Sequence, residues 1–290
     1  MTRYRTLLEA VYRLYEHSGF AMASAVAFSF VVSLFPFCIF LGALAGLFGG
    51  RELADAAVTQ LFEILPGGVA NGIAPEVRNI MSISRFDLLT VGGGLSLFFA
   101  TTAIETLRAA LNGAYRVQET RPYPLCLALS MVFVFVSAAS MLIVSWAVVV
   151  GPGIAAKFNP SWLKSIFDSS WVTVTWRYFF AATAIGLQLL AYHLWLAAGQ
   201  RKLKEVLPGI TLSVVLWLTI AGLYSYYLGY SNYSRFYAGL SQLMIALIFF
   251  QVSAIVVILG AELNRGIIEL KKFSSVETLS KPQETEQVET

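Results

Sequence analysis

Six polar side chains that lie within or at the ends of apolar stretches are the strongest candidates for chemistry in this chain. They are Glu105, Arg108, Asn112, Arg177, Glu262 and Asn264. Charged and amide groups are costly in lipid and often mark binding sites or ion pathways there. We predict that Arg177 attracts an anionic headgroup and that the other five form a polar gate at the inner end of the helices. The alternative is that all six anchor and cap helices near the membrane interface.

Catalytic and metal-binding patterns are missing from the sequence. The two histidines, His17 and His193, are far apart, and the two cysteines, Cys38 and Cys126, lack metal-ligand spacing. A nuclease or metallohydrolase needs several histidines and carboxylates that converge on a metal ion. We therefore predict no enzyme activity, no metal and no cofactor, and ribonuclease activity is disfavoured. The net charge of +3, spread over loops, predicts no nucleic-acid partner.

Long apolar stretches must position the candidate residues. Hydrophobic residues make up 57% of the 290 residues and charged residues only 13%, whereas soluble domains carry about 25% charged residues. A membrane-spanning helix needs about 20 apolar residues. Such stretches lie near 20–48, 86–107, 124–150, 171–198, 208–229 and 239–262. The sequence predicts an all-α polytopic membrane protein whose six transmembrane helices form one domain over 20–270.

The distribution of lysine and arginine predicts the orientation of these helices. With the N-terminus inside, the inner segments carry thirteen basic residues and the outer segments six. Since basic residues favour the cytoplasmic side, both termini are predicted to be cytoplasmic. Residues 1–19 have apolar residues on one helical face, which predicts an amphipathic helix at the membrane interface. The tail, 271–290, is rich in polar residues and is predicted to be disordered.

Two local features bear on how the helices pack. The connection 51–85 has apolar residues at helical spacing on both sides of a Pro-Gly-Gly sequence, which predicts an external helical hairpin. This hairpin either caps a cavity or is a packing collar without function. In the first span, small residues recur every fourth position and Pro36 is predicted to kink the helix. Kinked, small-residue helices suit both moving helices and close static packing.

Several short segments carry a family pattern: 25–29 and 33–36 in the first span, 107–116 at the inner end of the second, Leu207-Pro208-Gly209, 236–239, and the closing Gly260-Ala-Glu-Leu-Asn264. In these segments the chain resembles the YihY/BrkB (ribonuclease BN-like, UPF0761-type) family of membrane proteins. The resemblance covers roughly residues 10–270. It implies a six-span protein of the bacterial inner membrane with no agreed enzymatic role. Links of some relatives to lipopolysaccharide or lipid export imply a role in moving envelope lipids.

These observations lead to two functional hypotheses. The first is a transporter or flippase-like protein that moves a lipid or other amphiphile through a cavity bordered by the first, second and sixth spans. The second is a non-catalytic scaffold that docks an envelope-assembly protein through the 51–85 hairpin. Membrane lipids are the expected partners, and homo-oligomerisation is left open. No nucleotide-binding motif is present, so the sequence offers no direct energy source.

Overall fold

The computed structural model describes residues 3–64, 86–158, 170–230 and 241–280, and these residues contain helices and no strand. The elements are α1 (Arg3–Glu16), α2 (Gly19–Ile64), α4 (Phe86–Tyr115), α5 (Tyr123–Phe158), α7 (Ser170–Ala191), the π-helix η1 (Tyr192–Leu196), α8 (Leu203–Tyr230) and α10 (Ser241–Ser280). The predicted all-α class is confirmed over this part of the chain.

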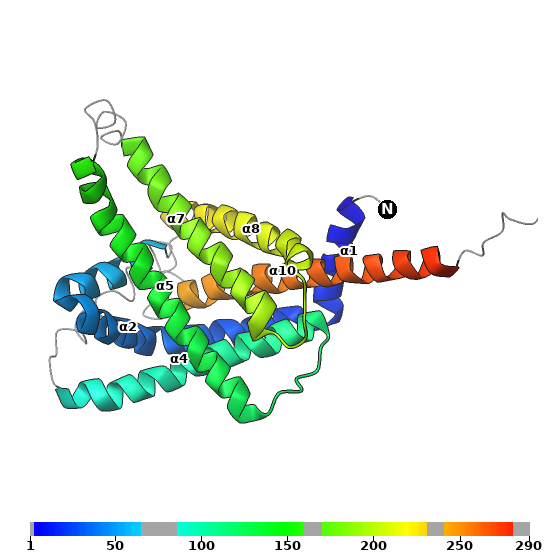
Figure 1. Ribbon diagram of the computed structural model, residues 1–290, viewed down its shortest axis with the longest axis horizontal. Coiled ribbons are helices and arrows are strands. Elements are labelled where there is room, and N and C mark those ends of the chain that lie inside the picture. The colour runs from blue at the N-terminus through cyan, green and yellow to red at the C-terminus, as the bar shows by residue number, and fades with distance from the viewer. Residues whose placement is uncertain (1–2, 65–85, 159–169, 231–240, 281–290) are drawn as a thin grey trace, which may run out of the picture.

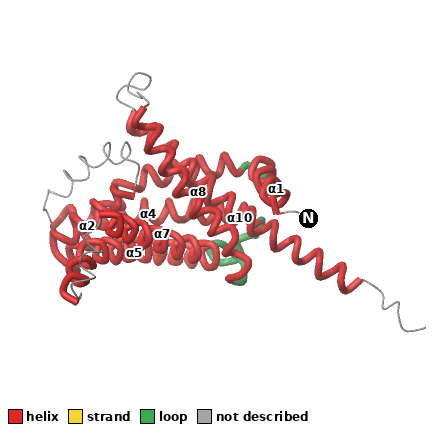
Figure 2. The backbone as a smooth tube through the Cα atoms, turned by 90° about the horizontal axis from the view of Figure 1, so that it is seen from above, coloured by secondary structure: helices red, strands yellow, loops and turns green. Residues whose placement is uncertain are grey.

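The long helices form one bundle around a shared apolar core. In Figure 1, α2, α4 and α10 run roughly along the long axis of the molecule, and α5 and α7 cross them steeply. Small side chains such as Ala23, Ala110 and Ala261 are almost fully buried, which allows these helices to approach closely. The C-terminal part of α10 extends beyond the bundle in both views (Figures 1 and 2).

Part of the membrane topology is visible in the described residues. Three helical stretches are long and apolar enough to cross a membrane: Tyr123–Val144, Leu203–Tyr224 and Leu243–Lys272. A bent pair, Leu8–Glu16 with Gly19–Leu34, would count as a fourth. The three stretches correspond to the predicted third, fifth and sixth spans. The full set of six spans and the orientation stay predictions.

Five helices are longer than the predicted apolar stretches, and α5 and α8 are two of them. α2 continues from the first predicted span into the segment 51–85, which was predicted to form the external hairpin, and α2 ends at Ile64. The rest of the predicted hairpin, 65–85, lies outside the described residues. α4 continues past 107 to Tyr115, and α10 continues to Ser280. Residues 271–280 are therefore helical rather than disordered, whereas 281–290 lie outside the described residues. Pro36 lies within α2, which remains helical through it.

The predicted amphipathic segment at the N-terminus forms α1, and α1 has a protein partner. Its axis is turned by 75° from that of α2. Ala10 and Leu14 are buried, and Arg13 pairs with Glu269 of α10 at 2.7 Å. The exposed side chains of Leu8, Val11, Tyr12 and Tyr15 remain available to the membrane interface. One face of α1 is thus a packing surface for α10 rather than a lipid-facing surface.

Candidate functional site

A cluster of charged side chains surrounds Glu119, in the connection between α4 and α5. The Glu119 carboxylate accepts hydrogen bonds from Arg121 Nε at 2.7 Å and Arg121 Nη2 at 2.8 Å. It also accepts from Arg108 Nη1 at 2.6 Å and from Asn112 Nδ2 at 3.1 Å. Hydrogen bonding from Arg121 is the main cause that holds the pKa of Glu119 well below its usual value. We call these four residues the Glu119 cluster.

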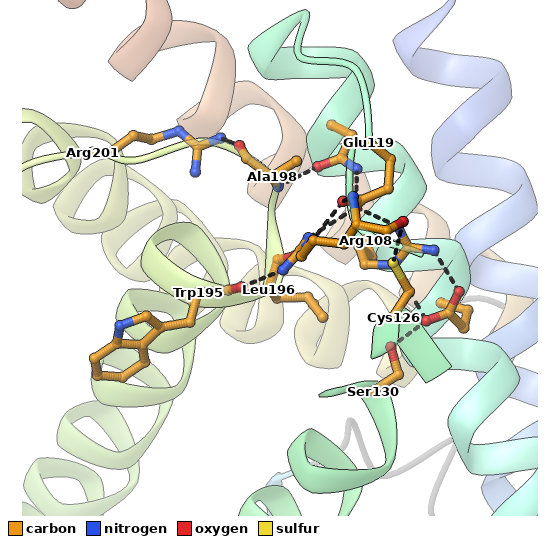
Figure 3. Close-up of polar contacts among 11 residues, drawn as sticks. Arg108, Glu119, Cys126, Ser130, Trp195, Leu196, Ala198 and Arg201 are labelled. Carbon is orange, nitrogen blue, oxygen red and sulfur yellow. Dashed lines mark hydrogen bonds and ion pairs between the residues drawn. The ribbon is translucent and has the colours of Figure 1, made fainter. Parts of the chain in front are cut away.

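The Glu119 cluster ties four segments of the chain together, as Figure 3 shows. Arg108 also pairs with Glu105 one turn earlier on α4, at 2.5 Å, and Ser130 of α5 donates to Glu105. Arg121 donates to the backbone carbonyls of Trp195 at 3.1 Å and Leu196 at 2.9 Å. The amide of Asn112 accepts from the Ala198 N–H at 2.7 Å. The ends of α4, α5 and η1 are therefore joined by side chains that each make several hydrogen bonds.

A second network surrounds Asn264, where α8 and α10 cross. Its Oδ1 accepts from the Gly209 N–H at 2.7 Å, and its Nδ2 donates to the Val206 carbonyl at 2.9 Å. The same Nδ2 lies 3.2 Å from the Tyr115 hydroxyl, which is 2.6 Å from Nδ1 of His193. Asn264 and His193 are completely buried. Asn264 therefore connects α8, α10 and α4, and Tyr115 extends the network to η1.

The closing Gly-Ala-Glu-Leu-Asn sequence fits this crossing residue by residue. A Cβ at Gly260 would lie 2.2 Å from Ser213 Oγ and 2.7 Å from the Gly209 carbonyl oxygen, so only glycine allows this approach. Two residues on, the buried carboxylate of Glu262 pairs with Arg116 at 2.9 Å. Arg116 also lies 2.6 Å from Nδ1 of His17, between α1 and α2. Burial of Glu262 is tolerated because its charge is paired.

Five of the six predicted site residues thus lie at one end of the bundle. We call it the charged end: the C-terminal part of α4, segments 117–122 and 197–202, and α10 from Glu262 onward. Glu105, Arg108 and Asn112 join one network, and Glu262 and Asn264 join the neighbouring ones. All five have protein partners, so the geometry supports helix anchoring as directly as it supports a gate. Arg177 lies in α7, and its side chain is outside the described part of the structure.

Sequence reasoning missed several members of these networks. Arg116, Arg121 and Arg201 contribute to the sequence prediction only as basic charges of inner segments, and Glu119 and Tyr115 are not among the predicted site residues. The one available signal was Glu119 itself, a lone acid in a basic connection. Their partners are more than 70 residues away in several cases, such as Arg121 with Leu196. Spacing along one helix cannot reveal contacts of that kind.

A central cavity of about 370 Å³ lies inside the bundle. All six long helices line it, including α2, α4 and α10, which the sequence predicted to border a cavity. Its wall is mostly apolar, with side chains such as Phe30, Met141 and Phe249. Several polar groups on the wall are paired: Gln188 donates to Ser137 at 2.8 Å, and Trp217 donates to Ser253 at 3.1 Å. This lining suits an apolar chain better than an ion.

The described residues offer no catalytic centre of a familiar kind. Within them, no group of three or more histidines, cysteines, aspartates or glutamates is placed to hold a metal ion. His193 is enclosed between Tyr115 and the carbonyl-bound Arg201. The arrangement can hold helices together and enclose apolar matter, and it presents no set of groups that would activate water.

Comparisons with known proteins agree with a membrane protein. The chain is 24% identical to the "putative ribonuclease-like protein YfkH" of Bacillus subtilis over 264 residues, which cover 89% of this chain and 93% of that protein. It is 25% identical to a "UPF0761 membrane protein" of Xanthomonas axonopodis pv. citri and to one of Xanthomonas campestris pv. campestris. The alignments cover 84% of this chain but only 56% of each Xanthomonas protein. No solved structure matches the chain.

The family comparison extends over nearly the whole chain. Residues 10–286 match the family described as virulence factor BrkB. That range includes both ends of the bundle, the central cavity and the Gly260–Asn264 crossing. The chain is an integral membrane protein of the BrkB/UPF0761 family.

Proposed function

We propose that this protein transports a lipid or a similar amphiphile across or within the membrane, with the acyl part of the molecule entering the central cavity. The observation that carries the proposal is the cavity itself, which all six long helices line with mostly apolar side chains. Its volume of about 370 Å³ lies within the range of about 300–1,000 Å³ usual for small-molecule sites. By the positive-inside rule, the charged end faces the cytoplasm.

The energetic cost of an unfilled cavity supports an occupant. Apolar side chains that face an unfilled space lack contact atoms on that side, and an apolar chain that enters the space supplies those contacts. Water is a poor occupant because the wall is mostly apolar and several of its polar groups already have partners. An acyl chain restores the missing contacts without leaving a polar group unpaired.

The charged end would act as the closed side of the pathway. The Glu119 cluster joins α4, α5 and η1, and the Glu262–Arg116 pair joins α10 to α4. Passage of a headgroup at this end requires some of these pairs to separate, which is the role predicted for the polar gate. The scaffold alternative relies on the 51–85 hairpin, of which 65–85 lies outside the described residues, and no contact of the described part supports it.

Proteoliposomes containing the purified full chain test the proposal. Fluorescent phospholipid is placed in both leaflets, and dithionite quenching measures how fast inner-leaflet lipid reaches the outer leaflet. We expect faster exchange than in empty vesicles. Ser140→Phe fills the cavity and should remove most of the protein-dependent rate, whereas Ala139→Phe, one residue away on the exposed face of α5, should not. Equal rates in protein-containing and empty vesicles would refute transport of the phospholipid tested.

A further inference from the structure

A second pocket, separate from the central cavity, lies at the charged end. Its volume is about 460 Å³. It lies between the end of α4, the 199–201 turn and the C-terminal part of α10. The residues around it are Tyr115, Arg116, Val117, Gly199, Gln200, Arg201, Arg265, Ile268, Glu269 and Lys272. We call it the basic pocket, because four of its ten residues are cationic and one is acidic.

The carboxylates near the basic pocket do not neutralise its charge. Glu269 is shared between Arg265, at 2.6 Å, and Arg13, at 2.7 Å. Glu262 is paired with Arg116. Apart from Lys272, the lining and its ion-pair partners comprise four arginines, including Arg201, and two carboxylates, an excess of two positive charges. This excess attracts anions into the pocket.

Arg201 is the cation whose charge is compensated least. Its guanidinium donates to the carbonyls of His193, at 2.7 Å, and Ala198, and it lies 3.7 Å over the ring of Tyr115. Among the described residues, no carboxylate pairs with it. Burial, and then repulsion from Arg121, lowers the pKa of Arg201. Figure 3 shows its side chain extended toward Ala198. These carbonyls fix the position of the guanidinium but leave its positive charge uncancelled.

We infer that the basic pocket binds a phosphate group, carried either by an anionic phospholipid or by a soluble phosphate compound. Arginine presents several donors in a planar fork that matches phosphate oxygens, and lysine adds a point charge. Arg201 and Lys272 border the pocket on different elements, the 199–201 turn and α10. Basic pockets on the cytoplasmic side of membrane helices suit phospholipid headgroups. The binding can be measured at equilibrium, so this inference stands whether or not the protein transports lipid.

The test measures binding to the full chain in nanodiscs of phosphatidylcholine. Three probes are titrated: short-chain phosphatidylglycerol, short-chain phosphatidylcholine and inorganic phosphate. Binding of each probe is measured as a rise in the melting temperature of the protein. We expect phosphatidylglycerol or phosphate to bind, and phosphatidylcholine to bind at least tenfold more weakly. Arg201→Gln should weaken anion binding about tenfold. Lys202→Gln, an exposed neighbour outside the pocket, should change it by less than about twofold.

Two further variants separate loss of binding from loss of folding. Lys272→Gln removes a charge from an exposed position of the pocket wall and should weaken binding. The melting temperature of this variant without ligand is measured beside its affinity, so that a loss of binding is distinguished from a loss of folding. Arg201→Lys keeps the charge and should bind more tightly than Arg201→Gln. A preference for phosphatidylglycerol over inorganic phosphate assigns the ligand to the membrane, and the reverse assigns it to the cytoplasm. Equal binding of all three probes, or equal effects of Arg201→Gln and Lys202→Gln, would overturn the inference.

Discussion

Asn264→Ala should destabilise the protein more than any single change to an exposed polar residue. The side chain of Asn264 is completely buried and bridges two points of the α8 backbone, Gly209 N–H and Val206 C=O. Pro208 lies between them and has no N–H of its own to donate. Removing the amide leaves both backbone groups without this partner, at the point where α8 and α10 are closest. Tyr115 loses one contact but keeps His193.

The size of the effect follows from those lost bonds. A buried donor or acceptor left without a partner costs about 1–3 kcal/mol. Interhelical hydrogen bonds in membrane proteins average about 0.6 kcal/mol, because the polar groups also find partners when the helices are apart. In the folded Asn264→Ala variant, however, the close approach of Gly209 and Gly260 restrains the backbone and keeps the two α8 groups from finding new partners. We therefore expect a loss of about 2–4 kcal/mol, or about 5–15 °C in melting temperature.

This loss is measured by thermal unfolding in detergent. The readout is the reactivity of the Cys126 thiol, which is buried in the folded protein and becomes accessible on unfolding. Gln251→Ala is the matched control, since it removes an amide of the same helix whose hydrogen bond within the described residues goes to the exposed Ser24. It should change the stability by less than about 0.5 kcal/mol. If Asn264→Ala lowered the melting temperature no more than Gln251→Ala, the crossing would not depend on the Asn264 amide, and this reasoning would be wrong.

Two further predictions concern the neighbouring contacts. Gly260→Ala should separate α8 from α10 and lower the melting temperature by at least as much as Asn264→Ala, because the added Cβ would clash with the backbone carbonyl of Gly209. Gly222→Ala is the control and should leave the melting temperature unchanged, because the space around Gly222 is open. Glu119 has a lowered pKa, so it contributes stability that is present above its ordinary value of 4.5 and is lost as the pH falls below it. Glu119→Gln should destabilise the protein at pH 7, and its melting temperature should fall less than that of the unmodified protein between pH 5 and about pH 3. If both proteins lost the same amount of stability over this pH range, Glu119 would not be the cause of the acid sensitivity.

Hydrophobicity alone was sufficient to predict the helical class, but it could not predict where the helices end. α4 and α10 continue beyond their apolar stretches because ion pairs support the extra turns. Glu105 with Arg108, and Arg265 with Glu269, are spaced three and four residues apart on one helical face. The three-residue spacing of the first pair is visible in the sequence, and the structure contains the ion pair. The extension of α10 has a second support, the Arg13–Glu269 pair across to α1, which no local pattern reveals.

The candidate site was predictable only in part, for a related reason. Polar residues in apolar stretches identified Glu262 and Asn264, since burying such groups is costly without partners. Their partners were not identifiable, because Arg116 and Gly209 are far away along the chain. The central cavity was predicted to border three helices and is lined by six. Its shape depends on how α5 and α7 cross the other helices, and apolar patterns alone do not encode a crossing angle.

The π-helix η1 connects the two places where this protein is proposed to hold a ligand. Tyr192, its first residue, lines the central cavity and lies 3.1 Å from the Ser137 hydroxyl. The carbonyl of the next residue, His193, accepts a hydrogen bond from Arg201 in the wall of the basic pocket. A π-helix departs from the regular α-helical backbone and often occurs at functional sites. The carbonyl contact of Arg201 therefore lies on the residue next to Tyr192, so one turn of backbone carries both an anchor of the basic pocket and part of the wall of the central cavity.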